Sequence, residues 1–215
     1  MTRLQLALDD ISLEEALGLL EQIHDYVDII EVGTPFLIEY GVEAIRKIKK
    51  QFPSLYVLCD GKIMDAGAYE AEQMFAAGAD CITVLALTDD STIRACVETA
   101  KTHHGEVMVD MICVSDLGTR AREVEELGAG IVAVHTGVDQ QARGRTPLGD
   151  LIELKGSITK AQVAVAGGIS EKTIDAYMAQ KPDIVIVGGG IVHQTDRVAA
   201  AKNIHEMIRR LEEAQ

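Results

Sequence analysis

Short apolar segments recur roughly every 25 residues along this chain, and this spacing restricts its possible folds more than any other feature. Each segment is apolar on both faces, as a strand must be when helices cover both sides of its sheet. Eight such segments predict eight parallel strands, at residues 4–8, 27–32, 55–59, 81–85, 107–114, 131–135, 163–166 and 184–187.

Helical patterns separate the predicted strands. Ser12 and Glu15 form a capping box, which opens an amphipathic helix. Residues 91–97 and 171–178 alternate apolar and polar side chains at helical spacing, and residues 196–211 form the closing helix. The helices and strands therefore alternate along the whole chain.

The count of elements distinguishes between two folds. Gly78 and Gly128 end helices just before strands, so no linker interrupts the alternation. Eight strands and eight helices in strict alternation predict a single compact (β/α)₈ barrel domain over residues 1–215. A doubly wound open sheet shares the alternation and is the alternative fold. The count of eight, with polar residues after nearly every strand, favours the barrel.

The composition fits an aliphatic core and limits the possible partners. Hydrophobic residues make up 47% of the chain, aromatics only 4%, and Trp is absent, so Val, Ile, Leu and Ala must build the core. The net charge is −14 and no basic stripe occurs, which argues against a nucleic acid or an anionic membrane as partner. Phosphate is not excluded, because backbone N–H groups in Gly-rich loops bind it without net positive charge.

The cysteines and the start of the chain predict a cytoplasmic protein. Cys59, Cys81, Cys96 and Cys113 show no CxxC spacing, and most lie in apolar segments, as small core residues do in a reducing compartment. No apolar run approaches 18 residues, and the first five residues do not begin a signal peptide.

A D-x-K-x-x-D pattern directly follows the third predicted strand. Asp60 ends the strand, Lys62 lies two residues further on, and Asp65 should start the next helix. A carboxylate and an ammonium side by side each favour the other's ionised form. Such a cluster can hold a divalent cation and orient an oxygen-rich substrate. Taken alone, the pattern also fits a surface loop with an ion pair.

Carboxylates also lie near the ends of the first two strands. Asp9 follows the first strand, Glu31 lies in the second, and Asp60 belongs to the third. In a barrel these side chains converge on one mouth, where their repulsion costs energy unless a cation sits among them. We therefore favour an active site, with a metal held by carboxylates, over three structural helix caps.

Glycine-rich turns follow the last two strands. Gly167 and Gly168 come after the seventh strand, just before Ser170, a plausible cap of the next helix. Gly188, Gly189 and Gly190 come after the eighth. Each turn alone could simply permit positive φ. Together, at the two positions where barrels recurrently bind phosphate, they predict a phosphate site.

His135 ends the sixth strand and is the candidate acid or base. Imidazole exchanges protons near neutral pH. A single His is more often a satisfied core residue, but the polar segment 139–145 that follows indicates an exposed loop facing a substrate. The sequence assigns no chemistry to His24, His103, His104, His193 and His205, nor to Arg143 and Arg145.

The same residues carry a resemblance to a known family. Over essentially its whole length the chain resembles the 3-hexulose-6-phosphate synthases of the orotidine monophosphate decarboxylase suprafamily. The D-x-K-x-x-D pattern marks the suprafamily, and E-x-G-T-P at 31–35 and H-x-G-x-D at 135–139 narrow it. The matching segments are residues 5–9, 28–35, 60–67, 79–84, 135–139, 165–169 and 187–191.

The resemblance implies a reversible aldol condensation of ribulose 5-phosphate with formaldehyde, with Mg²⁺ as cofactor. It implies removal of a proton from C1 by His135 to give an enediolate. Glu31 and Asp60 would hold the metal that stabilises this charge, and Lys62 would add a hydrogen bond. Asp9 would hold sugar hydroxyls.

The resemblance also implies a quaternary structure. In the suprafamily, the residue matching Asp65 reaches into the neighbouring subunit's site, which implies a homodimer with shared active sites. Asp60 and Lys62 would serve their own subunit.

Two other functions stay open at this point. The 3-keto-gulonate-6-phosphate decarboxylases share nearly the same carboxylates and His, but they typically have Arg where this chain has Val138 and Gly189. The missing arginine at 138 weakens the decarboxylase interpretation, and the glycine at 189 implies that backbone N–H groups, and not a guanidinium, hold the phosphate. A non-catalytic phosphosugar-binding barrel would need the glycine turns but neither Lys62 nor His135.

Overall fold

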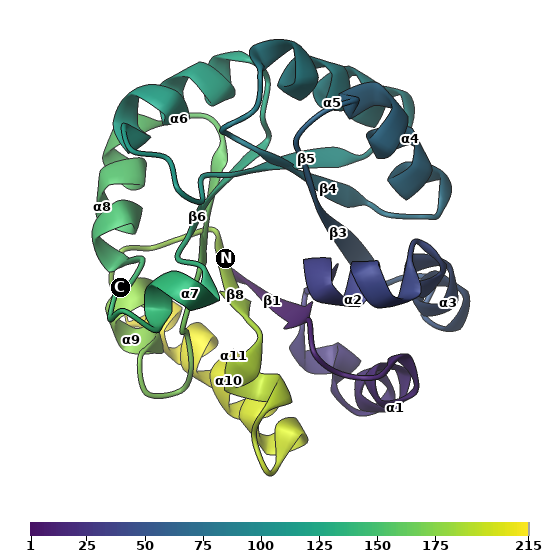
Figure 1. Ribbon diagram of the computed structural model, residues 1–215. Helices are drawn as coiled ribbons and strands as arrows, with labels where there is room; N and C mark the ends of the chain where they lie inside the picture. Colours follow the sequence, from purple (N-terminus) through teal and green to yellow (C-terminus); the bar gives the residue numbers. More distant parts are fainter. Residues whose placement is uncertain (215) are drawn as a thin grey trace.

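The computed structural model of the protein describes residues 1–214 and is a closed barrel of parallel strands in chain order (Figure 1). The closure of β1 against β8 confirms the barrel and rules out the open sheet. The strands are β1 Arg3–Leu8, β2 Ile29–Val32, β3 Tyr56–Ile63, β4 Cys81–Leu85, β5 Glu106–Asp110, β6 Ile131–His135, β7 Gln162–Ala166 and β8 Ile184–Val187.

Two predicted strand ends were wrong, and both lie at the mouth of the barrel. β3 continues to Ile63, so Asp60 and Lys62 lie within the strand and not after it. This extension contains an irregularity, because the pairing of β3 with β4 shifts between Cys59 and Ile63. β5 was predicted to reach residue 114, but it ends at Asp110.

Helices surround the barrel, but they do not alternate one for one with the strands. Within residues 1–214 the helices are α1 Leu13–Ile23, η1 His24–Tyr26, α2 Thr34–Tyr40, α3 Glu43–Gln51, α4 Gly67–Ala76, α5 Asp90–Thr102, α6 Leu117–Glu126, α7 Val138–Gln141, α8 Leu148–Ser157, α9 Ile174–Met178, α10 Gly189–Val192 and α11 Arg197–Glu213. The prediction of eight helices was therefore wrong. Short helices α2, α7 and α10 follow β2, β6 and β8 and form part of the rim in Figure 1.

The helix boundaries confirm some predicted caps and correct others. Ser12 and Glu15 form the predicted capping box, and Asp196 caps the closing helix. Ser170 does not cap α9, which begins only at Ile174. Asp65 does not start α4, because Gly67 is its first residue and the preceding Ala66 has a left-handed backbone.

The two faces of each strand have different surroundings. Leu4, Leu6 and Leu8 of β1 point outward and pack with the helices. The inward face of the barrel is filled at its base by a separate apolar cluster of Ala7, Ile29, Leu58, Cys81, Met108, Ile131, Ala133, Ala164, Ile184 and Ile186. Polar side chains lie on both sides of this cluster: Arg3 binds Gln162 and Tyr56 binds Glu106 at the amino-terminal end, and the cavity lies at the carboxyl end.

The same aspartate hydrogen bond occurs three times at the amino-terminal end of the barrel. The residue just before β2, β4 and β8 is Asp, and its carboxylate accepts the N–H of the second residue in the preceding strand. The pairs are Asp28 with Leu4 at 2.8 Å, Asp80 with Val57 at 2.7 Å and Asp183 with Val163 at 2.8 Å. These carboxylates satisfy strand N–H groups and fix the register.

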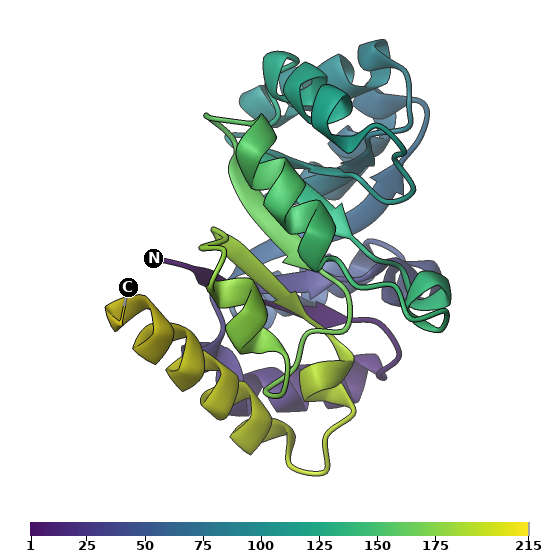
Figure 2. The same ribbon diagram turned by 90° about the vertical axis from the view of Figure 1, so that its left-hand side faces the viewer.

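Met1 and the last turn of α11 lie side by side at this same end, away from α7 (Figure 2). The amino group of Met1 is 3.9 Å from Glu212 of α11.

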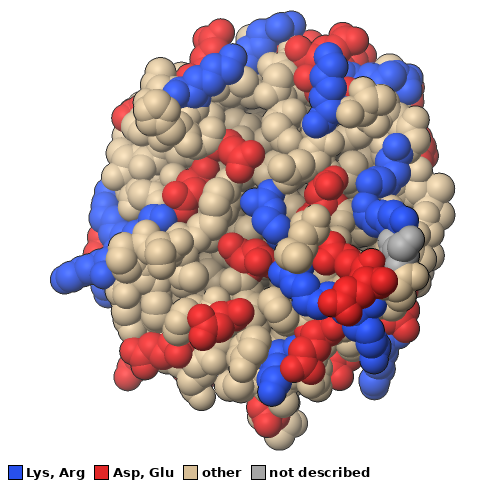
Figure 3. Space-filling model, turned by 180° about the vertical axis from the view of Figure 1, so that it is seen from behind, with Lys and Arg blue, Asp and Glu red and all other residues tan. Residues whose placement is uncertain are grey.

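On the face opposite to that of Figure 1, positive and negative side chains are interspersed (Figure 3). Within residues 1–214, no helix is both long and apolar enough to span a bilayer.

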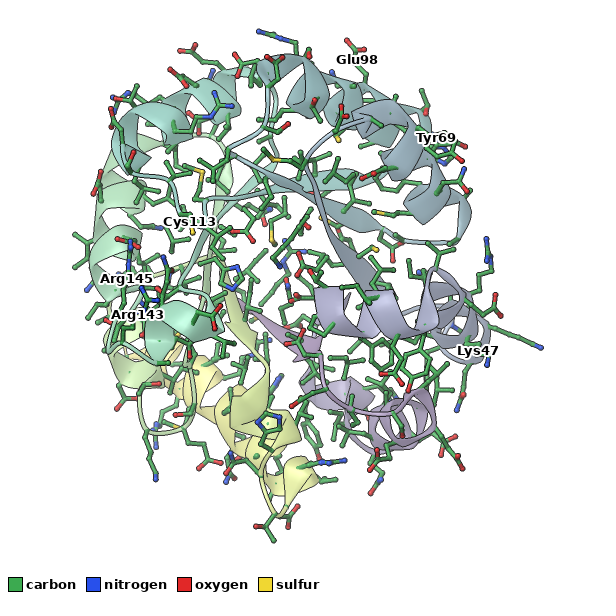
Figure 4. The ribbon with its side chains drawn as sticks, in the orientation of Figure 1. Lys47, Tyr69, Glu98, Cys113, Arg143 and Arg145 are labelled. Carbon is green, nitrogen blue, oxygen red and sulfur yellow. The ribbon has the colours of Figure 1, made fainter. Side chains whose placement is uncertain are left out.

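We predict that Asp80→Ala lowers the free energy of unfolding by about 1–3 kcal/mol, because the buried N–H of Val57 loses its acceptor. Lys49 also loses its ion pair with Asp80, at 2.8 Å. Urea denaturation measures the change. Glu98→Ala is the control, because this carboxylate projects from α5 into solvent (Figure 4) and its loss should change stability by less than about 0.5 kcal/mol. Equal effects of the two substitutions would contradict the prediction.

Candidate active site

A cavity of about 1050 Å³ opens at the carboxyl ends of the strands. It brings together every residue predicted for the site except Asp65. Its lining includes Asp9, Glu31, Asp60, Lys62, His135, Gly167, Gly168, Gly188, Gly189 and Gly190. The convergence of predicted strand ends on one mouth is therefore confirmed.

The irregular part of β3 places Asp60 and Lys62 side by side in the cavity. Lys62 has a φ of 44°, a left-handed conformation that a non-glycine residue adopts only at a cost. Thr83 of β4 holds this backbone: its hydroxyl accepts the Lys62 N–H at 2.9 Å and donates to the Asp60 carboxylate at 2.7 Å. The Lys62 ammonium in turn binds Asp60 in an ion pair.

Gly61 lies between these two residues, and its lack of a side chain lets the irregular strand pack closely against α4. A Cβ at this position would come within 2.2 Å of the terminal methyl of Met74, on α4. Met74 is buried, so it packs directly under the strand. Helix α4 thus supports the backbone from behind, while Thr83 holds it from the side.

The pairing of Asp60 and Lys62 keeps both groups charged despite burial. Burial alone would raise the pKa of Asp60, but the Lys62 ammonium and hydrogen bonds from Lys62, Thr83 and Thr34 outweigh it and lower the pKa. Burial likewise opposes the Lys62 ammonium, yet the carboxylates of Asp60 and Asp110 raise its pKa. At neutral pH the strand therefore presents a charged pair to the cavity.

The charged forms of Glu31 and Asp9 are disfavoured, unlike those of Asp60 and Lys62. Glu31 is only 8% exposed, and burial, with the neighbouring Asp60 carboxylate as the next cause, raises its pKa well above the ordinary value. Gln5 offsets part of this by donating to Glu31 at 2.6 Å. Burial and Asp60 also raise the pKa of Asp9. Asp9 occupies the space over Gly33, where a Cβ would lie 2.0 Å from its carboxylate.

His135 is held by Asp110, a residue for which no role was predicted from the sequence. Asp110, at the end of β5, is 2.9 Å from His135 Nδ1 and 3.8 Å from the Lys62 ammonium. A carboxylate at Nδ1 fixes the ring so that Nε2 is the nitrogen that can exchange a proton. Asp110 could have been recognised from its place on a strand end, but its partners depend on the register of three strands.

The charged cluster fits a divalent cation only in part. Within residues 1–214, no group of three or more His, Cys, Asp or Glu side chains is arranged to hold a metal. Glu31 and Asp60 nevertheless offer the hard oxygen donors that Mg²⁺ prefers, and Mg²⁺ is usually held by one or two carboxylates with waters and substrate. Burial is the main cause of the raised pKa of Glu31, and repulsion from Asp60 is the next. A cation between the two carboxylates would relieve that repulsion.

The two glycine turns lie against each other. A Cβ at Gly190 would come within 2.4 Å of the carbonyl oxygen of Ile169, in the turn after β7. Gly167 has a φ of 124°, and a Cβ there would be 2.7 Å from the carbonyl of Thr136. Glycine is therefore required in both turns for close backbone approach. Both turns line the cavity and form one wall of it.

Asp65 lies outside this cavity. It is exposed, and its carboxylate accepts the N–H of Ala66 at 2.7 Å. Its position leaves it accessible to another molecule, and its predicted role in a partner's site stays a prediction.

Three further residues of the site were missed. Thr34 and Thr83 bind the Asp60 carboxylate, and Gln5 binds Glu31. Gln5 and Thr83 are polar residues in otherwise apolar strands, which is the signal that could have identified them.

His193, to which the sequence assigned no chemistry, also lines the cavity. The exposed Cys113 does as well, whereas the other three cysteines are buried, as predicted for most of the four.

A parallel barrel with carboxylates, a lysine and a histidine at the carboxyl ends of its strands belongs to the class of (β/α)₈ barrel enzymes. Within that class, the chain belongs to the orotidine 5'-phosphate decarboxylase / HUMPS family, whose model matches residues 2–204.

Named relatives cover nearly all of the chain. A 3-hexulose-6-phosphate synthase from Bacillus subtilis (strain 168) is 45% identical over 205 residues, 95% of this chain and 98% of the relative. A solved 3-hexulose-6-phosphate synthase from Salmonella typhimurium is 50% identical with a TM-score of 0.95, covering 98% of this chain and 100% of that one. A 3-keto-L-gulonate-6-phosphate decarboxylase from Vibrio cholerae O1 is 28% identical with a TM-score of 0.84, covering 98% of each. The synthases are thus the more similar of these relatives.

We predict that Glu31→Gln stabilises the metal-free protein by about 0.5–2 kcal/mol at pH 8, because it removes a buried charge and keeps the shape. The folded-state pKa of Glu31 is raised, by burial and then by Asp60, so the stability that this group contributes is present at low pH. That contribution is lost as the pH rises through the raised pKa, and the advantage of the variant should therefore grow from pH 4 to pH 8. Urea denaturation in EDTA tests this.

Glu98→Gln is the matched control, because it makes the same substitution on an exposed face of α5. It should change stability little at either pH. A Glu31→Gln variant less stable than the unmodified protein at pH 8 would show that the Glu31 carboxylate is stabilised in the folded state.

Proposed function

We propose that the protein is a 3-hexulose-6-phosphate synthase, which condenses D-ribulose 5-phosphate with formaldehyde in a reversible, Mg²⁺-dependent aldol reaction. The observation that carries the proposal is the Lys62–Asp110–His135 cluster beside Asp60, in a cavity whose far wall is the two glycine turns. Relatives named as this synthase support it, at 45% and 50% identity.

The cavity suggests an orientation for the substrate. The glycine turns would take the phosphate, because they line the cavity and have no side chains of their own between a ligand and the backbone N–H groups. The reacting carbons would then lie over Asp60, Lys62 and His135. Asp9, between these two ends, would accept hydrogen bonds from sugar hydroxyls.

The reaction requires a base and stabilisation of negative charge. His135 Nε2 would take the proton from C1 of the ketose, leaving an enediolate over C1 and C2. C1 would then bond to the formaldehyde carbon, and the carbonyl electron pair would move to its oxygen, which takes up a proton. The ketone carbon thereby becomes the third carbon of the product, as in a 3-hexulose.

The remaining polar groups would hold the developing charge. The Lys62 ammonium would donate to an enediolate oxygen, and Asp110 would keep the His135 ring oriented during proton transfer. Glu31 and Asp60 would hold Mg²⁺, which when bound supplies Lewis-acid stabilisation of the substrate oxygens. Lys62 binds Asp60 in the structure, so the ammonium lies beside a carboxylate that would hold the metal.

The alternatives have less support. The related decarboxylase is only 28% identical, and Val138 is 79% exposed at the cavity, where an arginine would be expected for decarboxylation. A barrel that only binds a phosphosugar would not need the strained Lys62 backbone or the oriented His135. Such strain usually persists only where it serves a function.

We also propose a homodimer whose two subunits share their active sites through Asp65. Exposed apolar side chains lie in the segments after β2, β3 and β4, around the part of the chain that carries Asp65, and Tyr69 projects from α4 (Figure 4). They are Ile38, Met64, Tyr69 and Leu87, exposed by 81%, 53%, 70% and 51%. Exposed apolar side chains mark an interface where they form one patch, and we propose that these four do so. The dimer would act in the cytoplasm, in keeping with four free cysteines.

We expect the purified protein with Mg²⁺ to consume formaldehyde in the presence of D-ribulose 5-phosphate. EDTA should abolish the activity, and Mg²⁺ or Mn²⁺ should restore it. The kcat/KM for the aldol reaction should exceed that for decarboxylation of 3-keto-L-gulonate 6-phosphate. Full activity in metal-free protein would exclude the metal's role, and a higher kcat/KM for decarboxylation would assign the protein to the other subfamily.

Mixed dimers of two inactive variants test the shared site. Asp65→Asn and His135→Asn should each reduce the rate by about 10²-fold or more as homodimers. If Asp65 acts in the partner's site, one site of each mixed dimer carries both substitutions and the other carries neither. About half of the unmodified activity should then return. No recovery, with mixed dimers shown to form by mass spectrometry, would place Asp65 in its own subunit's site.

A further inference from the structure

The cavity is strongly acidic, which poses a problem for a phosphorylated substrate. Six carboxylates line it: Asp9, Asp10, Glu31, Asp60, Asp110 and Asp139. Three basic side chains among the described residues line it with them, namely Lys62, His135 and His193. A phosphate that enters must find positive charge or strong donors near the glycine turns, because like charges repel.

Two of the three basic groups are committed elsewhere. Lys62 is bound by Asp60 and lies 3.8 Å from Asp110, and His135 is held by Asp110. Arg143 and Arg145, which follow α7, do not replace them. Both lie towards the edge of the barrel (Figure 4), neither lines the cavity, and Arg145 is paired with Asp150 at 2.8 Å. His193 is also paired with a carboxylate, Asp10, but only through Nε2, and its Nδ1 lies against the glycine turn.

His193 is held directly over the glycine turn that follows β8. Its Nε2 lies 2.8 and 2.7 Å from the two carboxylate oxygens of Asp10, in the loop after β1. Its Nδ1 lies 2.8 Å from the point where a Cβ of Gly189 would stand. The ring therefore occupies the space that a side chain at 189 would fill. Both side chains are more than half exposed, at 58% for His193 and 62% for Asp10, so a ligand can reach the ring.

We propose that His193, oriented by Asp10, binds the phosphate group of the substrate at the glycine turns. With Nε2–H donated to Asp10, Nδ1 is the nitrogen that faces the turn. Both nitrogens donate only in the imidazolium form, the form in which the ring would bridge Asp10 and the phosphate. His193 thus supplies the charge that the backbone N–H groups of the turn lack. The inference rests on the proposed phosphosugar substrate and adds a specificity-determining residue to it.

His193→Gln tests the inference, because glutamine keeps a polar side chain and removes the cation. We expect the affinity for inorganic phosphate, measured by calorimetry and as a competitive inhibition constant, to fall about 10-fold. KM for the phosphosugar should rise by a similar factor, while kcat at saturation changes less than about 3-fold, since the reacting atoms lie at the other end of the cavity. Restoring a cation with His193→Arg should recover part of the phosphate affinity.

His103→Gln is the matched control. His103 is also paired with a carboxylate, Glu72, at 2.7 Å, but it lies at the end of α5 and does not line the cavity. This variant should leave phosphate affinity and KM unchanged. Phosphate affinity and KM that are the same in His193→Gln as in the unmodified protein would overturn the role of His193. If the unmodified protein shows no aldol activity, the proposed function fails instead, and the phosphate titration still decides whether His193 binds the anion.

Discussion

The ion pair between Asp60 and Lys62 is formed within a single strand, and the arrangement of the cavity depends on it. An ordinary strand would end before Lys62, but β3 continues past it through a left-handed residue and a shifted register. The pair keeps an ammonium among carboxylates that burial would otherwise neutralise. From this position Lys62 also reaches Asp110, which in turn orients His135. Lys62 is thus the only lysine or arginine among the described residues that line the cavity with these carboxylates.

The barrel divides stability and chemistry between its two ends. At the amino-terminal end, carboxylates such as Asp80 and Asp183 accept strand N–H groups and contribute to stability. At the carboxyl end, Glu31 is buried with its charge disfavoured, and Lys62 has a strained backbone. The apolar base of the barrel and its ring of helices offset these costs. This division explains how one small fold tolerates a destabilising cluster of charges.

The sequence predicts the barrel and most of the cavity because both follow from short-range patterns. Apolar runs locate strands, and parallel strands bring their carboxyl ends together, so Asp9, Glu31 and His135 could be placed at one mouth. The course of β3 could not be predicted, because the positive φ falls on Lys62 and not on Gly61. Helices as short as α7 and α10 escape detection, since four residues show no periodicity. The partners of Asp110 depend on register, which no local pattern specifies.

The contact between Gly61 and Met74 has a consequence for how the sequence can vary. A Cβ at 61 would meet the far end of a flexible side chain and not fixed backbone, so the obstacle can be removed by a change at 74. Residue 61 is thus free to acquire a side chain only if residue 74 becomes smaller or turns aside. The two positions, one in the catalytic strand and one in the helix behind it, form an epistatic pair. The order in which substitutions arise there decides whether each is tolerated.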